Sequence, residues 1–342
     1  MKAVEINEYG PVNVLKVTES VPIPDIAPNE VLIHNKATSV NPVDTRKRIG
    51  YGRSIFVKKR RREFPWIMGN DAAGVITKIG KKVSKFNIND EVFSALSGYK
   101  QGAWAEFVPV PEDAAAKKPK NLSFEEAASI PYVALTTWAA IVDRGGQNPG
   151  EGAGKKALVH AGSGGVGSFA IQLLKAWGWY VATTCSTRNV ELVKSLGADE
   201  VVDYTKDDFA KILKDYDLVY DTIGLNVTGN EIKSLSILKQ SSRAVYVSIV
   251  HPVVNSLDHY GLILGALKVM MDLTRKKIMN RGIGYHWAIF KPNGKALDLI
   301  REFIEAGKIK PVIDRKYNIQ QMTEAHKYIE TGHTRGKVVI KI

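Results

Sequence analysis

Residues 156–167 read KALVHAGSGGVG, an apolar run followed directly by a glycine-rich turn. The run from Lys156 to Ala161 is typical of a buried strand, and SFAIQLLKAW at 168–177 is typical of a helix. A G-x-G-x-x-G motif between a strand and a helix is the context that a dinucleotide site requires. The stretch therefore predicts the first βα unit of a dinucleotide-binding domain. The alternative is a glycine-rich turn that binds no ligand.

The residues of this turn have separate expected roles. Gly162 permits the tight turn, Gly164 lets the backbone approach a pyrophosphate, and Gly167 lets the helix pack close to the strand. The amides around Gly165 and Val166 lie at the expected helix N-terminus, where phosphate binding is favoured. We therefore predict that these backbone groups bind the pyrophosphate of a cofactor.

The alternation of strand and helix continues after this motif. A helix-like segment runs from Asn189 to Leu196, among strand-like runs at 180–184, 201–202, 218–220 and 244–249. This rhythm predicts a parallel sheet with helices on both faces.

The segments on either side have other patterns. From Met1 to roughly Ile130, short β-branched runs are broken by Pro, Gly, Asn and Asp, which favours a β-rich, partly barrel-like domain. The tail predicts helices at 295–306 and 323–330 and a last strand at 337–342. A chain of 342 residues suits two domains.

The composition limits the cellular setting. The single cysteine, Cys185, excludes an internal disulfide and fits a reducing compartment. The N-terminal MKAVEINEYG contains no apolar signal core and no Arg/Ser-rich leader, so we expect a cytoplasmic protein. The apolar stretch from Gly261 to Met271 is interrupted by Lys268 and is too short to span a bilayer. The net charge of +13 leaves a polyanionic partner open, although the scattered lysines favour a merely basic surface.

The end of the second parallel strand selects the nicotinamide cofactor. An NAD site usually places Asp or Glu there, whereas this chain has no acid between Thr183 and Glu191. A carboxylate would repel a 2′-phosphate, but Ser186 and Arg188 can donate hydrogen bonds to it. We therefore predict NADPH as the cofactor. The alternative for Arg188 is a solvated residue at the start of a helix.

Eight further short stretches are spread from one end of the chain to the other: SVNPVD at 39–44, GYG at 50–52, KQG at 100–102, IPYVALT at 130–136, VVDY at 201–204, YHWA at 285–288, AGKI at 306–309 and GHTRGK at 332–337. With the glycine motif, they make the chain resemble the medium-chain dehydrogenase/reductase superfamily. Within it, the chain resembles the zinc-independent quinone oxidoreductase branch, and there the family of the reticulon-interacting mitochondrial oxidoreductase and its bacterial relatives.

The resemblance implies an α/β fold with a GroES-like β domain and a Rossmann domain built on a doubly wound parallel sheet. We expect the GroES-like catalytic domain at 1–125 and 287–342, and the Rossmann NADPH-binding domain at 126–286. A homodimer is the family expectation.

The residues at the family's metal positions predict no zinc. Alcohol dehydrogenases of this superfamily have a catalytic Cys near the position of Ser39 and a Gly-His-Glu motif, which here reads Gly69-Asn70-Asp71. A catalytic zinc normally needs three Cys, His or carboxylate ligands. A structural four-cysteine lobe cannot form in a chain with one cysteine.

The resemblance also implies which side chains bind the cofactor. Ser163 would join the turn amides at the pyrophosphate, and Tyr204 would lie near the adenosine ribose or its phosphate. The matching positions are Ser163, Gly164, Gly165, Val166, Ser186, Tyr204, Thr222, His333, Thr334 and Arg335. Thr222 stands where relatives have Asn or Ser. The last three residues, without the resemblance, are typical of a turn before the final strand.

A reductase without metal or flavin needs orientation and a polar group that holds the acceptor oxygen. Asn41 and Tyr51 are our catalytic candidates, because an amide or phenol donates to a carbonyl as negative charge builds on it. The alternative for Asn41 is a cap before Pro42. Asp44 either orients a neighbour or starts a helix. Some quinone reductases of this branch carry Tyr in the position of Arg46.

Two segments have more than one interpretation. The basic run from Lys58 to Arg62 is either a solvated loop, a site for phosphate backbones or lipid headgroups, or an attractor for an anionic acyl-CoA thioester. The Met-rich segment from Leu262 to Met279 favours a core helix or a dimer interface over a surface for lipophilic ligands.

These residues predict an enzyme that transfers hydride from NADPH to a quinone or an α,β-unsaturated carbonyl acceptor. One alternative is a reductase of enoyl thioesters or alkenals. Another is an NADPH-binding protein with little catalysis that binds RNA or a protein partner, because a cofactor motif alone does not establish catalysis. The scattered lysines disfavour a nucleic-acid partner.

The cofactor choice can be tested at Arg188. Arg188→Ala should raise the KM for NADPH much more than the KM for NADH, because only NADPH carries the 2′-phosphate. Steady-state kinetics with both cofactors measure this difference. Equal effects on the two KM values would contradict the assignment.

Overall fold

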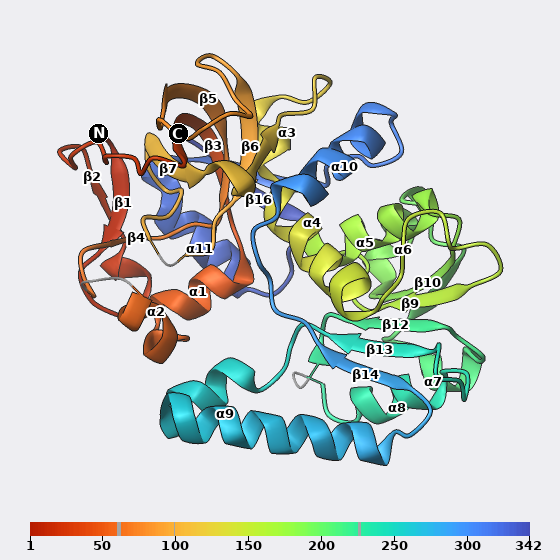
Figure 1. The fold of residues 1–342 in the computed structure, drawn as a ribbon. Coiled ribbons are helices and arrows are strands. Elements are labelled where there is room, and N and C mark those ends of the chain that lie inside the picture. The colour runs from red at the N-terminus through yellow and green to blue at the C-terminus, as the bar shows by residue number, and fades with distance from the viewer. Residues whose placement is uncertain (60–62, 99, 225–226) are drawn as a thin grey trace. The chain divides into compact units, whose positions relative to one another are not determined.

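The computed structural model describes residues 1–59, 63–98, 100–224 and 227–342, which form two compact units (Figure 1). Unit 1 contains Met1–Leu135, Lys291–Gly307 and Pro311–Ile342, and unit 2 contains Thr136–Phe290 and Lys308–Lys310. The domain boundaries expected from the sequence lie near these limits without coinciding with them. The chain leaves unit 1, forms unit 2, and returns to unit 1.

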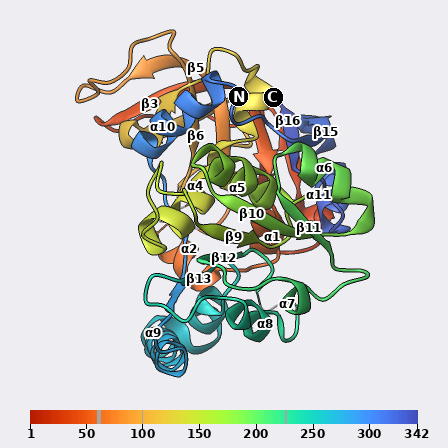
Figure 2. The same ribbon diagram turned by 90° about the vertical axis from the view of Figure 1, so that its right-hand side faces the viewer.

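Unit 2 is built on a sheet in which every strand pair is parallel, in the order β11-β10-β9-β12-β13-β14. Figure 2 labels its strands β9 to β13, and Figure 1 labels β14. Its strands are β9 (Lys156–Val159), β10 (Tyr180–Cys185), β11 (Glu200–Asp203), β12 (Leu218–Asp221), β13 (Val245–Ser248) and β14 (Gly284–Trp287). The strand order reverses direction between β9 and β12, the topological switch point where ligands of such sheets bind. The predicted parallel sheet is confirmed.

The helices of unit 2 lie between these strands in the chain. They are α5 (Gly165–Ala176), α6 (Val190–Ser195), α7 (Phe209–Ile212), α8 (Asn230–Ser236) and α9 (Val253–Met279), with short turns of helix at η3 (Ala139–Arg144) and η4 (Thr187–Asn189). Helix α5 begins three residues before the start expected at Ser168, because the glycines of the motif form its first turn. Helix α4 (Pro131–Trp138) crosses the boundary between the units.

The described residues of unit 1 form two sheets. The larger has the order β15-β16-β3-β5-β6-β8, with β7 also paired to β3, and the smaller has the order β2-β1-β4. The strands are β1 (Ala3–Ile6), β2 (Lys16–Thr18), β3 (Glu30–Val40), β4 (Trp66–Ile67), β5 (Asp71–Ile79), β6 (Glu91–Ala95), β7 (Phe107–Pro111), β8 (Ala115–Lys117), β15 (Ile313–Asn318) and β16 (Lys337–Lys341). The expected β-rich domain is therefore present.

The helices of unit 1 are α1 (Pro42–Arg48), α2 (Arg53–Lys59), α3 (Phe124–Ala128), α10 (Gly294–Glu305) and α11 (Met322–Glu330), with short turns η1 (Val12–Val14), η2 (Glu112–Ala114) and η6 (Ile319–Gln321). The two helices and the last strand predicted for the tail are confirmed as α10, α11 and β16. The sequence did not predict β15, whose residues IDRKYN are mostly polar. Residues 60–62 of the basic run lie outside the described residues, so the roles suggested for that run are not tested.

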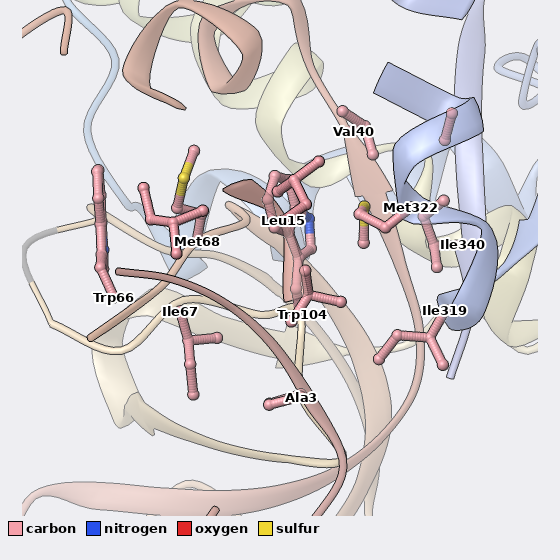
Figure 3. Close-up of a cluster of buried hydrophobic side chains, with 14 of the residues drawn as sticks. Ala3, Leu15, Val40, Trp66, Ile67, Met68, Trp104, Ile319, Met322 and Ile340 are labelled. Atoms are coloured by element: carbon pink, nitrogen blue, oxygen red, sulfur yellow. The ribbon is translucent and has the colours of Figure 1, made fainter. Parts of the chain in front are cut away.

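A buried apolar cluster joins the first residues of the chain to its tail (Figure 3). Ala3, Trp66 and Trp104 from the N-terminal part pack in one cluster with Met322 and Ile340 from the tail. Burying one side chain of the size of Met or Ile stabilises the fold by roughly 1.5–3 kcal/mol. The tail is therefore an integral part of unit 1.

His326, on α11, is a buried histidine beside this cluster. Its ring meets Trp104 edge-on with 5.0 Å between ring centroids, and its Nδ1 lies 3.5 Å from Nη1 of Arg48. Burial, together with the positive charge of Arg48, lowers the pKa of His326 to about 3. The imidazole is therefore neutral in the folded protein at neutral pH.

We expect the protein to lose stability as the pH falls below about 6.5, the pKa of an unperturbed histidine. Between that pH and the folded pKa of His326, the unfolded chain binds a proton that the folded state excludes. His326 thus contributes a loss of up to about 1.4 kcal/mol in the free energy of unfolding per pH unit. Urea unfolding between pH 7 and pH 5 measures this slope, and His326→Gln should reduce it. The same slope in both proteins would contradict this account.

Candidate cofactor site and buried polar network

The glycine-rich turn joins β9 to α5 and presents bare backbone at the start of that helix. Gly164 is the N-cap residue of α5, which runs for 12 residues. The first N–H groups of a helix have no acceptor within it, so the amides of Gly165 and Val166 point out of the helix end. A helix N-terminus with such amides favours an anion such as a pyrophosphate.

The glycines of this turn are present for different reasons. A Cβ added at Gly162 would collide with the Thr183 hydroxyl, and one at Gly167 would collide with the carbonyl oxygen of Ala161. At Gly164 the nearest atom to an added Cβ is the same carbonyl oxygen, 3.4 Å away, which is an ordinary contact. The packing of the chain therefore requires Gly162 and Gly167 but not Gly164. The glycine at 164 therefore leaves room for a ligand against the backbone.

Asn189 connects two of the predicted phosphate-binding side chains. Its buried amide donates from Nδ2 to Ser163 Oγ at 2.9 Å and to Ser186 Oγ at 3.3 Å. The two serines come from the turn after β9 and from the residue after β10, so the structure brings these predicted residues together. The sequence did not single out Asn189, because an asparagine near a helix start is common.

The residues after β10 and β11 carry charge beside these serines. Arg188 lies in η4 with an exposed side chain. Hydrogen bonds from the hydroxyls of Thr187 and Thr205 lower the pKa of Asp203, the last residue of β11, to about 2. The Nζ atom of Lys206 lies 3.6 Å from the same carboxylate. Asp203 is therefore ionised at neutral pH, and the ammonium group of Lys206 partly offsets its repulsion of a phosphate.

Tyr204 and Thr222 follow β11 and β12. Tyr204 is 60% exposed, so its ring is accessible to a ligand. The Thr222 hydroxyl donates to the carbonyl oxygen of His160 at 2.7 Å, so toward a ligand it can act only as an acceptor. The predicted cofactor contacts of these two residues stay predictions.

His333, Thr334 and Arg335 lie in unit 1, between α11 and β16. The backbone N–H of Arg335 donates to Asp314 Oδ2 at 2.8 Å, which fixes the turn before β16. The three residues thus form the turn that the sequence indicated, and their predicted contact with the cofactor stays a prediction.

Asp71, the first residue of β5, is the centre of a buried polar network in unit 1. Its carboxylate accepts hydrogen bonds from Ser39 Oγ, from Asn41 Nδ2 at 3.0 Å, and from the backbone N–H of Tyr132 at 2.7 Å. The ammonium group of Lys337, on β16, lies 3.3 Å from Asp71 Oδ2 and donates to Asn41 Oδ1. A buried carboxylate requires such a set of donors and a nearby cation.

A second buried pair lies on α1 next to this network. Lys47 Nζ lies 3.9 Å from Asp44 Oδ1 and donates to Asn70 Oδ1 at 2.9 Å. Burial raises the pKa of Asp44, whereas the charge of Lys47 opposes this shift. Asp44 Oδ2 accepts the backbone N–H of Asn41 at 2.9 Å.

These bonds settle where α1 begins. The helix starts at Pro42 with Asn41 at the N-cap position, where the backbone carbonyl of Asn41 accepts the N–H of Asp44. The Asn41 side chain makes no cap hydrogen bond, so the capping interpretation holds for the position of Asn41 and not for its amide group. The start expected at Asp44 is wrong by two residues: proline is accommodated at the first helical position, and Asp44 lies in the first turn.

The two catalytic candidates differ in exposure. The Asn41 side chain is 2% exposed, with Nδ2 bonded to Asp71 and Oδ1 to Lys337. A substrate carbonyl would compete with Asp71 for this amide. Tyr51 is half-buried in the turn after α1, and the Arg46 guanidinium lies 6.0 Å from its ring centroid. The predicted role of each as a donor to substrate stays a prediction.

Comparison with known proteins places this arrangement in a family. The descriptions "Alcohol dehydrogenase GroES-like domain" and "Zinc-binding dehydrogenase" match residues 27–120 and 196–340. The mitochondrial NAD(P)H oxidoreductase RTN4IP1 of Danio rerio is 41% identical over 356 residues, covering 100% of this chain and 91% of the relative. The chain belongs to the medium-chain dehydrogenase/reductase family. The GroES-like and Rossmann-type domains that the resemblance implied are therefore confirmed.

Other members of the medium-chain dehydrogenase/reductase family also match. The 2-methylene-furan-3-one reductase of Solanum lycopersicum is 36% identical, covering 99% of this chain and 79% of the relative. Among solved structures, the quinone oxidoreductase from Coxiella burnetii superimposes with a TM-score of 0.82 at 30% identity, covering 100% of this chain and 99% of that one.

The buried polar groups include Ser39, Asn70 and Asp71, which stand at the positions that the sequence resemblance matches with the metal ligands of zinc-dependent relatives. Asn70 is bonded on both sides, because Oδ1 accepts from Lys47 and Nδ2 donates to the carbonyl oxygen of Leu96 at 2.6 Å. Within the described residues, no three His, Cys, Asp or Glu side chains are arranged to hold a metal ion. Ser39 and Asn70 are not the Cys or His ligands that zinc prefers, and the ammonium group of Lys337 lies beside Asp71. The absence of a catalytic zinc stays a prediction.

The charge pairing of this network can be tested at Lys337. Lys337→Met leaves Asp71 as an unpaired buried carboxylate and should lower the free energy of unfolding by about 3–5 kcal/mol. The double variant Lys337→Met/Asp71→Asn should recover most of this loss, because the amide is neutral. Urea unfolding measures both values.

The exposed lysine of β15 provides the control for this test. Lys316→Met should change the free energy of unfolding by no more than about 0.5 kcal/mol. A double variant that is as unstable as Lys337→Met would show that charge pairing is not the reason for the loss.

Proposed function

We propose that this protein is an NADPH-dependent, zinc-independent reductase that transfers hydride to a quinone or an α,β-unsaturated carbonyl. The observation that carries the proposal is the turn after β9, where Gly164 leaves the backbone at the α5 N-terminus open to a pyrophosphate. The names of the relatives support an oxidoreductase, since they describe an NAD(P)H oxidoreductase, a furanone reductase and a quinone oxidoreductase.

The residues around this turn fit the cofactor. The amides of Gly165 and Val166, with Ser163, would hold the pyrophosphate, while Ser186 and Arg188 would bind the 2′-phosphate. Asn189 fixes both serines from one buried side chain. When bound, the reduced nicotinamide supplies the hydride, and Tyr204, Thr222 and the 333–335 turn are our further candidates for contacts with it.

We propose that the acceptor is activated without a metal. The donors around Asp71 are already hydrogen-bonded to its carboxylate, and the Lys337 ammonium offsets the negative charge of that carboxylate. Tyr51 is the more accessible of the two candidates for holding the acceptor oxygen. Asn41 would contribute through the amide that now bonds Asp71. Water protonates the product after hydride transfer.

The assembly and location of the protein are also proposals. We propose a homodimer, to be tested by sedimentation, and a cytoplasmic location, to be tested by fractionation of cells. The Danio rerio relative is named mitochondrial, which makes the second test necessary. No helix among the described ranges 1–59, 63–98, 100–224 and 227–342 is both long and apolar enough for a membrane span.

The decisive experiment is NADPH oxidation by the purified protein with a panel of acceptors. Short-chain quinones, a 2-alkenal and crotonyl-CoA are each tested with and without a metal chelator. We expect turnover with a quinone or the alkenal that the chelator does not reduce. Turnover with crotonyl-CoA alone would favour an enoyl thioester reductase. Tight NADPH binding without turnover would overturn the proposal in favour of a binding protein, which RNA titration would then examine.

The role of Tyr51 can be tested by removing its hydroxyl. Tyr51→Phe should lower turnover by more than about tenfold while NADPH binding stays unchanged, because the hydroxyl acts on the acceptor. Tyr180→Phe is the matched control, because the Tyr180 hydroxyl is bonded to Glu200 and should not affect turnover. Unchanged turnover in Tyr51→Phe would remove this residue from the mechanism.

A further inference from the structure

Helix α9 of unit 2 exposes a row of large apolar side chains. Single exposed apolar residues are normal on proteins, but a contiguous group marks an interaction surface. The group on this helix, which we call the α9 face, comprises Ile263 (79% exposed), Leu264 (64%), Leu267 (52%), Met270 (65%), Met271 (72%) and Ile278 (54%).

The helical repeat places these residues together and away from unit 2. Ile263, Leu267 and Ile278 lie on one side of the helix, because each residue advances by about 100°. The opposite side is the one that packs, since Leu273 joins the core of unit 2 and Lys276 Nζ lies 2.5 Å from Glu231. Figure 1 shows α9 beyond β14, along the edge of the parallel sheet. The prediction of a core helix is therefore wrong for this face.

Basic residues border the α9 face. Arg275 lies on one edge and Lys277 on the other, and both side chains are exposed. The acidic residue of this stretch, Asp272, is half-buried and lies 3.1 Å from Lys268 Nζ, so it is already paired. The helix therefore presents an apolar strip between positive edges, on a chain with a net charge of +13.

The apolar strip with basic borders fits an anionic lipid surface better than a second copy of this chain. An apolar face with Lys or Arg along its borders lies flat in a bilayer interface, with apolar side chains at the acyl boundary and cations at the headgroups. Residues 262–279 contain four basic side chains and a single acid, Asp272, so two copies of this helix would repel each other through their like net charge. The charge pattern favours an anionic lipid surface over a second copy.

We propose that α9 docks this protein onto an anionic phospholipid bilayer through the α9 face. Ile263, Leu267 and Met271 enter the acyl boundary, while Arg275 and Lys277 bind phosphate headgroups. The inference does not depend on the proposed reductase activity. If that activity holds, docking brings the enzyme to the phase in which long-chain quinones dissolve.

The experiment is co-sedimentation of the full-length protein with vesicles. Vesicles of phosphatidylcholine with phosphatidylglycerol should bind the protein, vesicles of phosphatidylcholine alone should bind it less, and added salt should weaken the binding. Ile263→Gln/Leu267→Gln/Met271→Gln should lower binding at least about tenfold, because three apolar side chains no longer enter the bilayer. Ile232→Gln, at a residue of α8 that is 74% exposed, is the matched control and should bind normally.

A second pair of variants tests the charges. Arg275→Gln/Lys277→Gln should lose roughly fivefold in binding per residue on anionic vesicles and little on neutral ones. Lys211→Gln/Lys214→Gln removes the same charge from exposed positions of unit 2 outside α9 and should have little effect.

Two results would overturn the proposal. One is sedimentation no greater with vesicles than without them. The other is a wild-type dimer that the triple glutamine variant converts to a monomer in size-exclusion chromatography, because a second copy would then cover the α9 face. Turnover of a water-soluble short-chain quinone is measured in parallel. The triple variant should retain it, so a failure of docking and a failure of the reductase activity can be told apart.

Discussion

The buried carboxylate of Asp71 is the constraint on which unit 1 depends. Its charge is stable in the interior only because donors arrive from distant segments: Ser39 from β3, the amide of Tyr132 at α4, and the Lys337 ammonium from β16. The last strand must therefore return to the first domain. The apolar cluster around Trp104 also joins the tail to the N-terminal segment, but hydrophobic burial has no preferred direction. The ion pair between Lys337 and Asp71 fixes the position of β16 relative to β5, because it requires specific atoms to meet.

Unit 2 depends on shape rather than charge. Gly162 and Gly167 are fixed by the close approach of β9, β10 and α5, where a Cβ has no room. Once these three elements meet, the helix end and the turn are held in place. Gly164 and the serines tied by Asn189 are then held in one arrangement, as the proposed cofactor site requires. The rigidity required for cofactor binding thus comes from local packing.

Much of the fold could be predicted from the sequence, because local signals determine it. The glycine motif and the alternation of apolar runs identified the parallel sheet, and helical periodicity identified α10 and α11. Lys337 and Asn189 were not identified as site residues, because their roles arise from contacts with residues far along the chain or from neighbours of ordinary type. β15 was missed because an edge strand with polar side chains lacks the apolar alternation on which strand prediction depends.

The role of helix α9 could not be assigned from its sequence pattern alone. Its Met-rich segment is consistent with a core helix, a dimer interface or a lipid-facing helix, and composition alone does not separate these. The structure removes the first alternative for the α9 face, because Leu273 packs against the buried cluster of unit 2 from the other side of the helix while Ile263 and Met271 are mostly exposed. The remaining two differ in charge: a lipid surface attracts Arg275 and Lys277, whereas a copy of the same helix repels them. Electrostatics therefore decides between partners that hydrophobicity cannot distinguish.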